Sequence, residues 1–289
     1  MIYKIQNECL TVGIDSFGAE LKSVKDTNDR EYMWSGDKNY WGKTSPVLFP
    51  IVGCIKGGCY VHEGENYQIS RHGFARDMEF TVENHYEDRI VFYLTDTAET
   101  YKMYPFRFRF EIEYRLKRNR LEVMWRVINR ENKDMYFALG GHPAFACPNG
   151  VGKRTDCYIH FDTKEKLELS EVNLELGLVT GNKKEVFLDD GYLLVEQETF
   201  DQDALVIENN QCHEISLCSK EKKPFVTVSF DAPLVGVWSV KDSDANFVCI
   251  EPWYGRCDRT DFEGELKDKE WINKVKPQEI FEASYCIEV

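Results

Sequence analysis

The sequence lacks the features that would place the protein in a membrane or on a nucleic acid. It has no run of about 18 uncharged apolar residues, which a transmembrane helix needs. Residues 1–8 show no basic segment followed by an apolar run, so no signal peptide is predicted. Basic residues are few, because 36 Lys and Arg stand against 50 Asp and Glu, and the net charge is −14. Such a surface repels phosphate backbones and anionic lipid. We therefore expect a cytoplasmic protein that binds neither nucleic acid nor membranes.

Closely spaced cysteine pairs are also missing. None of the ten cysteines belongs to a Cys-x-x-Cys pair, the usual framework of a structural zinc site. Cys157 and His160 have a metal-like spacing, but no second pair accompanies them. Together with the missing signal peptide, this pattern predicts free thiols, most of them buried as small apolar residues.

The chain shows no compositional sign of disorder or of a linker. Its 289 residues are 43% hydrophobic and 30% charged, as in ordinary globular proteins. A length of ~150 residues per domain would suggest two domains, but single all-β domains often reach this size. No Pro- or Ser-rich linker and no internal repeat divides the sequence.

The hydrophobic pattern repeats every two residues, which is typical of β-strands. In residues 108–116, apolar and charged side chains alternate, and the alternation resumes in residues 121–127 after a short polar break. Two such runs predict an antiparallel hairpin with one face in a core.

Further short runs of the same kind predict more strands, and helical signals are almost absent. Only residues 164–178 have possible helical character, with an ambiguous leucine spacing. Many short strands without interleaved helices indicate an all-β fold, a large antiparallel sandwich or barrel. The additional predicted strands are residues 90–95, 204–208, 214–218, 225–230, 247–251 and 281–287.

Two segments place a histidine in an unusual setting. Residues 70–76 form a basic cluster around His72 in an acidic protein. In residues 139–145, two glycines precede His142 and a proline follows it, so that backbone can approach closely there.

Two other segments present a carboxylate. Residues 249–255 end an apolar strand with Glu251 beside Trp253 and a tyrosine, and residues 199–205 place Asp203 directly before an apolar strand. Each residue alone has an ordinary explanation, such as an ion pair, a turn acceptor or a core ring. The co-occurrence of these residues favours a functional site. Aromatic rings beside fixed polar groups suit a sugar, because its C–H faces pack on the rings and its hydroxyls bond the polar groups.

The order of four motifs resembles the aldose 1-epimerases, and among them the LacX-like branch. The motifs are residues 40–50, 72–76, 140–145 and 251–255, and the resemblance extends from about residue 3 to the C-terminus. It implies the galactose mutarotase-like β-supersandwich, formed by residues 1–289 as a single domain without metal or cofactor.

The resemblance also implies roles for individual residues. Glu251 matches the general base and His142 the general acid, and these two are the expected catalytic residues. His72 matches the histidine that positions the sugar ring. Asp203 and Arg76 match residues that bind the substrate.

One departure from the family pattern concerns a basic residue. Related sequences commonly carry such a residue where this chain has Cys54, so Lys43 or Arg71 would have to supply that contact. We therefore add Arg71, together with the ring of Trp253, to the expected substrate-binding residues.

The expected chemistry needs only these residue types. Anomer interconversion removes the proton of the C1 hydroxyl, protonates the ring oxygen, and recloses the opened ring on the other face. A carboxylate and an imidazole can perform both transfers near neutral pH. The expected partner is a small aldose, a hexose or possibly a hexose phosphate. The net charge of −14 favours a neutral one.

Two other functions fit the same residues. A glycoside hydrolase could use Asp203 and Glu251 as its carboxylate pair, although such an enzyme would not need His142. A sugar-binding protein without catalysis could use the same cleft, although it would not need an acid and a base.

Overall fold

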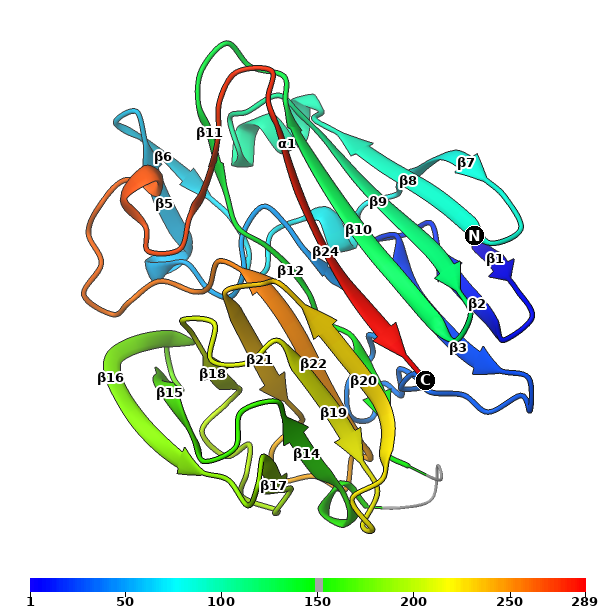
Figure 1. Cartoon of the computed structure of the whole chain (residues 1–289). Helices are drawn as coiled ribbons and strands as arrows, with labels where there is room; N and C mark the ends of the chain where they lie inside the picture. Colours follow the sequence, from blue (N-terminus) through cyan, green and yellow to red (C-terminus); the bar gives the residue numbers. More distant parts are fainter. Residues whose placement is uncertain (149–152) are drawn as a thin grey trace.

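The computed structural model describes residues 1–148 and 153–289, and antiparallel β-strands dominate it. Its largest sheet contains nine strands, counted over these residues, and the long strands β8, β9, β10 and β24 run side by side in Figure 1. The order is β17 (Tyr192–Leu194), β14 (Tyr158–Phe161), β19 (Glu214–Cys218), β20 (Pro224–Phe230), β24 (Ile280–Glu288), β10 (Arg120–Asn129), β9 (Phe108–Lys117), β8 (Arg89–Thr95) and β7 (Thr81–His85).

A second sheet has eight strands within the described part of the chain. Strand β13 pairs with β22 beside the main path of this sheet. The strands are β16 (Leu178–Phe187), β15 (Lys166–Asn173), β18 (Leu205–Ile207), β21 (Leu234–Trp238), β22 (Phe247–Tyr254), β12 (Leu139–Gly141), β4 (Val47–Leu48) and β13 (Ala144–Ala146).

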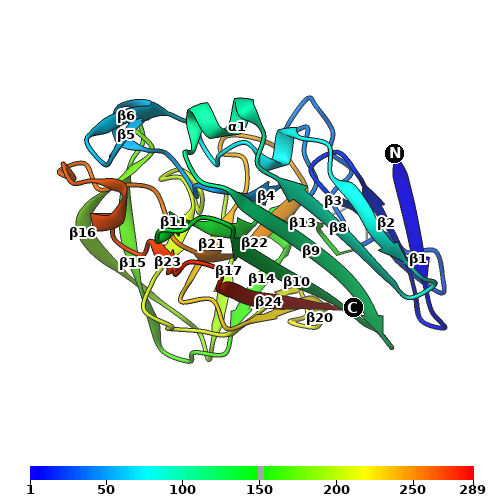
Figure 2. The same ribbon diagram turned by 90° about the horizontal axis from the view of Figure 1, so that it is seen from above.

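Smaller elements flank the two large sheets. Figure 2 shows a three-stranded sheet at the N-terminal side and the β5–β6 hairpin at the opposite side. None of the helices among the described residues is long and apolar enough to cross a bilayer. These elements are β1 (Ile2–Gln6), β2 (Leu10–Asp15), β3 (Glu20–Asp26), β5 (Cys59–His62), β6 (Glu65–Gln68), β11 (Met135–Phe137), β23 (Asn273–Val275), α1 (Ala98–Met103) and the 3₁₀ turns Lys56–Gly58, Ala75–Asp77, Arg154–Asp156 and Leu266–Asp268.

The main core lies between the two large sheets. Val226 and Val228 of β20 and Val248 and Ile250 of β22 belong to one cluster of buried side chains. The same cluster includes residues from β1 to β24. The hydrophobic pattern predicts an all-β antiparallel sandwich or barrel, and the sandwich, which the family resemblance implies, is the observed architecture.

The predicted hairpin of residues 108–116 and 121–127 is confirmed. Strands β9 and β10 pair in register from Lys117 with Arg120 to Phe108 with Asn129. The other predicted strands correspond to β8, β18, β19, β20, β22 and β24, within a few residues at their ends.

The prediction of possible helical character in residues 164–178 is wrong. The segment forms β15 and the first residue of β16, and β15 pairs with β16 on one side and with β18 on the other. Leu167 and Leu169 alternate with exposed Lys166 and Glu168, so the period is two. Pairing on both edges stabilises the strand against the weak helical leucine spacing. The short helix α1, which the pattern does not predict, begins with a capping box between Thr97 and Thr100.

Candidate active site

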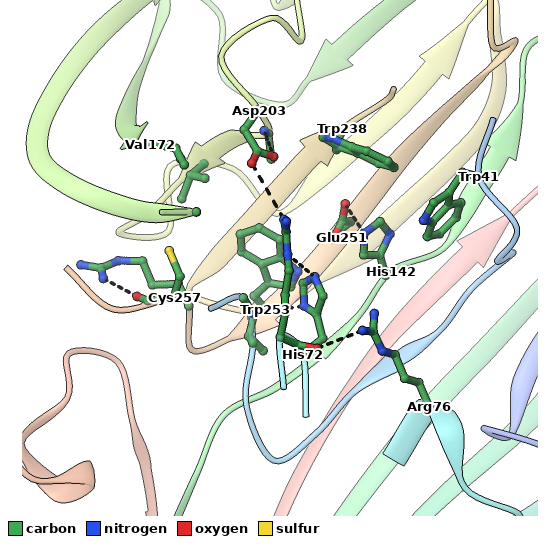
Figure 3. Close-up of a pocket in the computed structure, with 17 residues that line it drawn as sticks. Trp41, His72, Arg76, His142, Val172, Asp203, Trp238, Glu251, Trp253 and Cys257 are labelled. Atoms are coloured by element: carbon green, nitrogen blue, oxygen red, sulfur yellow. Dashed lines mark hydrogen bonds and ion pairs between the residues drawn. The ribbon is translucent and has the colours of Figure 1, made fainter. Parts of the chain in front are cut away.

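A cavity of about 310 Å³ opens on the face of the eight-stranded sheet that points away from the main core. All seven site residues expected from the sequence line this cavity, although they come from distant parts of the chain. Figure 3 shows several of them converging on one space. The seven are Arg71, His72, Arg76, His142, Asp203, Glu251 and Trp253.

Glu251 lies at the floor of the cavity, on β22. Alternate residues of this strand face the cavity, and Gly236 of β21 stands directly opposite Glu251. Only glycine fits there, because a Cβ would lie 2.4 Å from the ring of Trp253. The Glu251 side chain is 1% exposed. Burial, followed by the negative charge of Asp203, raises the pKa of its carboxyl well above the usual range.

His142 lies beside Glu251, just after the short strand β12. Close packing requires glycine at position 140, since a Cβ there would lie 2.7 Å from Cδ1 of Trp253. The backbone N–H of His142 donates to the carbonyl of Pro46 at 3.1 Å. Its Nε2 lies 3.4 Å from Oε1 of Glu251. Burial lowers the pKa of His142 to about 3, so that its neutral form is favoured in the empty cavity.

Two tryptophans that the sequence analysis does not include hold the His142 ring. Trp41 stacks on it with ring centroids 4.8 Å apart, and Trp238 meets it edge-on at 5.6 Å (Figure 3). Trp41 belongs to the family-like motif of residues 40–50, which is a signal for its role. Trp238 carries no such signal, because an aromatic residue in an apolar strand is usually a core residue.

His72 faces the same space from the opposite wall. Its backbone has a φ of 68°, an uncommon conformation for a residue with a side chain. The backbone N–H of Gly53 donates to Nδ1 at 3.1 Å. Nε of Arg71 donates to Nε2 at 3.3 Å. A neutral imidazole accepts at only one of its two nitrogens, so the ring can bond only one of these two donors at a time. Burial, and then the charge of His142, lowers the pKa of His72 well below its usual value.

Arg71 and Asp203 face each other at the mouth. An Arg71 guanidinium nitrogen lies 3.8 Å from Oδ2 of Asp203. Asp203 has a φ of 70°, and its Oδ1 accepts a hydrogen bond from the backbone N–H of Ala204 at 2.8 Å. Arg76 donates to the backbone carbonyl of Arg71 at 2.9 Å and so holds this segment in place. The mouth is therefore charged, whereas the floor is buried.

The two candidates for the missing basic contact behave differently. Lys43 donates to Asp77 at 3.0 Å and does not line the cavity, whereas Arg71 does. Cys54 does not line the cavity either. The Cys54 sulfur packs against Gly177, because a Cβ added at position 177 would lie 3.0 Å from that sulfur. Of the two basic residues, only Arg71 is in a position to touch a ligand.

Arg256 is a further lining residue that the sequence analysis does not include. Its Nε donates to Glu208 at 2.7 Å, one terminal nitrogen donates to the carbonyl of Cys257 at 2.9 Å, and the other bonds Glu270. It follows the family-like motif of residues 251–255 directly, but an arginine after a glycine is no signal by itself.

Several buried polar atoms of the cavity have no hydrogen-bond partner within the described part of the chain. A folded protein rarely leaves such atoms unpaired unless a ligand or water serves them. They include donors and acceptors, as the hydroxyls of a sugar require. The four atoms are Nε of Arg76, Nδ1 of His142, Oε2 of Glu251 and Nε1 of Trp253.

Comparisons with known proteins identify the family of the chain. The family model described as aldose 1-epimerase matches residues 1–271. Protein LacX (chromosomal) of Lactococcus lactis is 30% identical over 298 residues, covering 100% of this chain and 99% of that protein.

Two crystal structures share the fold closely. A galactose mutarotase related enzyme from Lactobacillus acidophilus is 37% identical, with a TM-score of 0.93 and coverage of 100% of this chain and 97% of the other. A galactose mutarotase-like protein from Lactobacillus casei is 26% identical, with a TM-score of 0.93 and coverage of 100% and 99%. The fold is therefore galactose mutarotase-like, and the chain belongs to the aldose 1-epimerase family.

Proposed function

We propose that the protein is an aldose 1-epimerase that interconverts the α and β anomers of an aldohexose. The observation that carries this proposal is the contact of 3.4 Å between His142 and Glu251, both buried, at the floor of a cavity of about 310 Å³. Proton transfer needs an acid and a base within reach of neighbouring substrate atoms. In the proposed roles, Glu251 takes the proton of the C1 hydroxyl and His142 protonates the ring oxygen.

The proton must move before the ring can open. Burial favours the neutral form of both groups, so in the empty cavity the shared proton lies on Glu251. A sugar hydroxyl that donates to the unpartnered Oε2 of Glu251 stabilises its carboxylate. The ring face of Trp41 stabilises the imidazolium. Substrate binding therefore shifts the proton to His142 and prepares the pair.

Other residues orient the sugar in this proposal. A ring nitrogen of His72 faces a sugar oxygen, and Asp203 accepts from hydroxyls at the mouth. Trp253 presents its apolar ring to the C–H face of the sugar. Neither transfer needs a metal or an activated group.

We further propose a free aldohexose as substrate in preference to a phosphorylated one. Arg71 faces Asp203, and Arg256 is held by Glu208 and Glu270, so these cations already have anionic partners. A phosphate would have to displace them, at a cost in desolvation and lost ion pairs.

Exchange NMR on a panel of free and phosphorylated aldoses tests both parts. Accelerated exchange between the anomeric signals of a free hexose is the expected result. Turnover of a hexose 6-phosphate at least about tenfold more efficient would contradict the preference for a neutral sugar. Binding of sugars without faster exchange would identify a non-catalytic sugar-binding protein. Release of a chromophore from an aryl glycoside would identify a hydrolase.

A further inference from the structure

A third side chain lies next to the pair of His142 and Glu251. A nitrogen of His142, the sulfur of Cys249 and a carboxylate oxygen of Glu251 lie within 4.8 Å of one another, and all three residues are buried. One nitrogen, one sulfur and one oxygen are ligands that Zn²⁺ accepts together. The proposed reaction uses the nitrogen and the oxygen, and it does not use the sulfur.

Strand geometry explains why the sulfur is there. Cys249 and Glu251 are two residues apart on β22, so both point to the cavity side of the sheet. Their partners on β21 are Trp238 and Gly236. Trp238 and Glu251 line the cavity, whereas Cys249 does not. The sulfur therefore lies next to the cavity floor without forming part of the cavity lining.

The spacing fits a tetrahedral ion. Bonds of about 2.0–2.2 Å to nitrogen and oxygen place these atoms roughly 3.3–3.6 Å apart around a tetrahedral zinc. The observed separation of Nε2 of His142 and Oε1 of Glu251 is 3.4 Å. The sulfur must come closer by up to about 1 Å to complete the set, which a side-chain rotation can supply.

The charge balance of the site also favours a cation. Among the described residues, His142 is the only basic side chain within ion-pair distance of Glu251. Oε2 of Glu251 and Nδ1 of His142 have no hydrogen-bond partner among residues 1–148 and 153–289, and these two residues are 1% and 8% exposed. Ionising this buried carboxyl without a nearby cation is costly, and a bound metal ion removes that cost.

We propose that His142, Cys249 and Glu251 form a binding site for a zinc-like divalent cation that inhibits the protein. The ion takes the place of the proton that the carboxylate and the imidazole share, and its fourth position opens toward the cavity, where water can bind. Binding releases two protons to solvent, the shared one and that of the thiol, so the carboxylate and the thiolate balance the charge of the ion. Hard cations such as Mg²⁺ do not bind, because they require oxygen ligands. Binding does not depend on the proposed function, whereas inhibition of anomer exchange does.

Titration of the reduced protein with Co²⁺ tests the binding. Co²⁺ follows zinc into such sites, and a cobalt–thiolate bond gives an intense charge-transfer absorption in the near ultraviolet. We expect this absorption in the wild type and its displacement by Zn²⁺. Cys249→Ser should lose it and bind Zn²⁺ at least about tenfold more weakly, since even loss of a residue behind a ligand costs that much.

A matched control removes another buried thiol. Cys218 lies on β19 in the nine-stranded sheet, and Cys218→Ser should keep the absorption and the zinc affinity of the wild type. If Cys249→Ser does not fold, Cys249→Ala serves in its place. Equal zinc affinity of wild type and the folded Cys249 variant would overturn the proposal, as would a cobalt absorption that survives this change.

The activity assay adds a second readout. Each variant is compared with its own metal-free rate of anomer exchange. Zn²⁺ should inhibit the wild type at least about tenfold more potently than Cys249→Ser, and Mg²⁺ should inhibit neither. If no aldose shows exchange, the proposed function fails but the cobalt titration still decides the metal site. Equal zinc inhibition of both proteins would contradict inhibition through this site.

Discussion

The two faces of strand β22 differ in whether their buried polar side-chain atoms have hydrogen-bond partners. On one face, Val248 and Ile250 are fully buried in the main apolar core. On the other face, Glu251 and Trp253 are nearly as buried, but each keeps a polar side-chain atom without a hydrogen-bond partner in the described part of the chain. Adjacent residues of one strand thus serve opposite purposes. The first face stabilises the fold, and the second keeps unpaired polar atoms for a ligand, at a cost in stability.

The largest expected effect concerns the cavity face. Glu251→Gln keeps the shape of the side chain but cannot take a proton, and His142→Asn cannot deliver one. Each change should slow anomer exchange by ~10²–10⁴-fold, the usual range for losing a general acid or base. Exchange NMR gives the rate, and thermal unfolding should show a melting temperature that does not fall for Glu251→Gln.

The double mutant tests whether the two residues act as one unit. Because both belong to the same proton transfer, the double change should be little slower than either single change. Rapid exchange in well-folded Glu251→Gln protein would contradict the assignment. A loss of stability with unchanged activity per folded molecule would show that the pair is structural.

The next prediction concerns the core face of the same strand. Ile250→Ala should lower the free energy of unfolding by about 2–5 kcal/mol, because it leaves a cavity between the two sheets. Exchange activity per folded molecule should be retained, since the side chain points away from the site. Urea unfolding and exchange NMR of the same sample compare the two readouts. A large loss of activity without loss of stability would erase the distinction between the faces.

Burial of His142 at the cavity should also make the free energy of unfolding depend on pH. Burial lowers the folded-state pKa of His142 to about 3 from its ordinary 6.5, so the unfolded chain takes up a proton first. The stability that neutral His142 contributes is complete above pH ~6.5 and is lost as the pH falls toward 3, by up to about 1.4 kcal/mol per pH unit. His142→Asn lacks this loss. Urea unfolding between about pH 7 and pH 4 should show the wild type losing stability faster than the variant, and parallel curves would refute this.

A smaller effect is expected at the mouth. The Arg71 side chain is half exposed, and its guanidinium nitrogen lies 3.8 Å from the Asp203 carboxylate, which is long for an ion pair. The ion pair is therefore weak. Arg71→Gln should raise KM by up to about tenfold, with little change in kcat. This is the effect expected when the sugar loses one hydrogen bond to a charged side chain. Lys43→Gln is the matched control, since Lys43 does not line the cavity. Equal effects of the two changes would remove Arg71 from the site.

The smallest expected effect concerns the reactivity of the cysteine thiols. Six cysteines are buried and four are half-buried. In denaturant without reductant, a thiol reagent should count close to ten groups, and in the native protein the half-buried ones should react first. A count near zero would contradict both free thiols and the expected cytoplasmic location. The half-buried cysteines are Cys9, Cys54, Cys59 and Cys286.

The sequence determined the class of fold because a period of two is a local property. Strands β9 and β10 could be located within two residues, since every second side chain must be apolar to face the core. The pattern failed in residues 164–178, where the spacing of the five leucines is ambiguous and only the pairing of β15 on both edges decides. It also gave no signal for α1, whose cap depends on two threonines.

The sequence also determined which residues were candidates for chemistry, because glycine, proline and aromatic neighbours mark unusual settings. Only the tertiary structure decided which of them meet. It placed Arg71 in the cavity and Lys43 outside it, and it added Trp41, Trp238 and Arg256. It also set the charge states of Glu251 and His142, since burial depends on the surrounding side chains from distant segments. Local sequence supplies the groups, whereas their distance and their dielectric surroundings arise only when the two sheets pack.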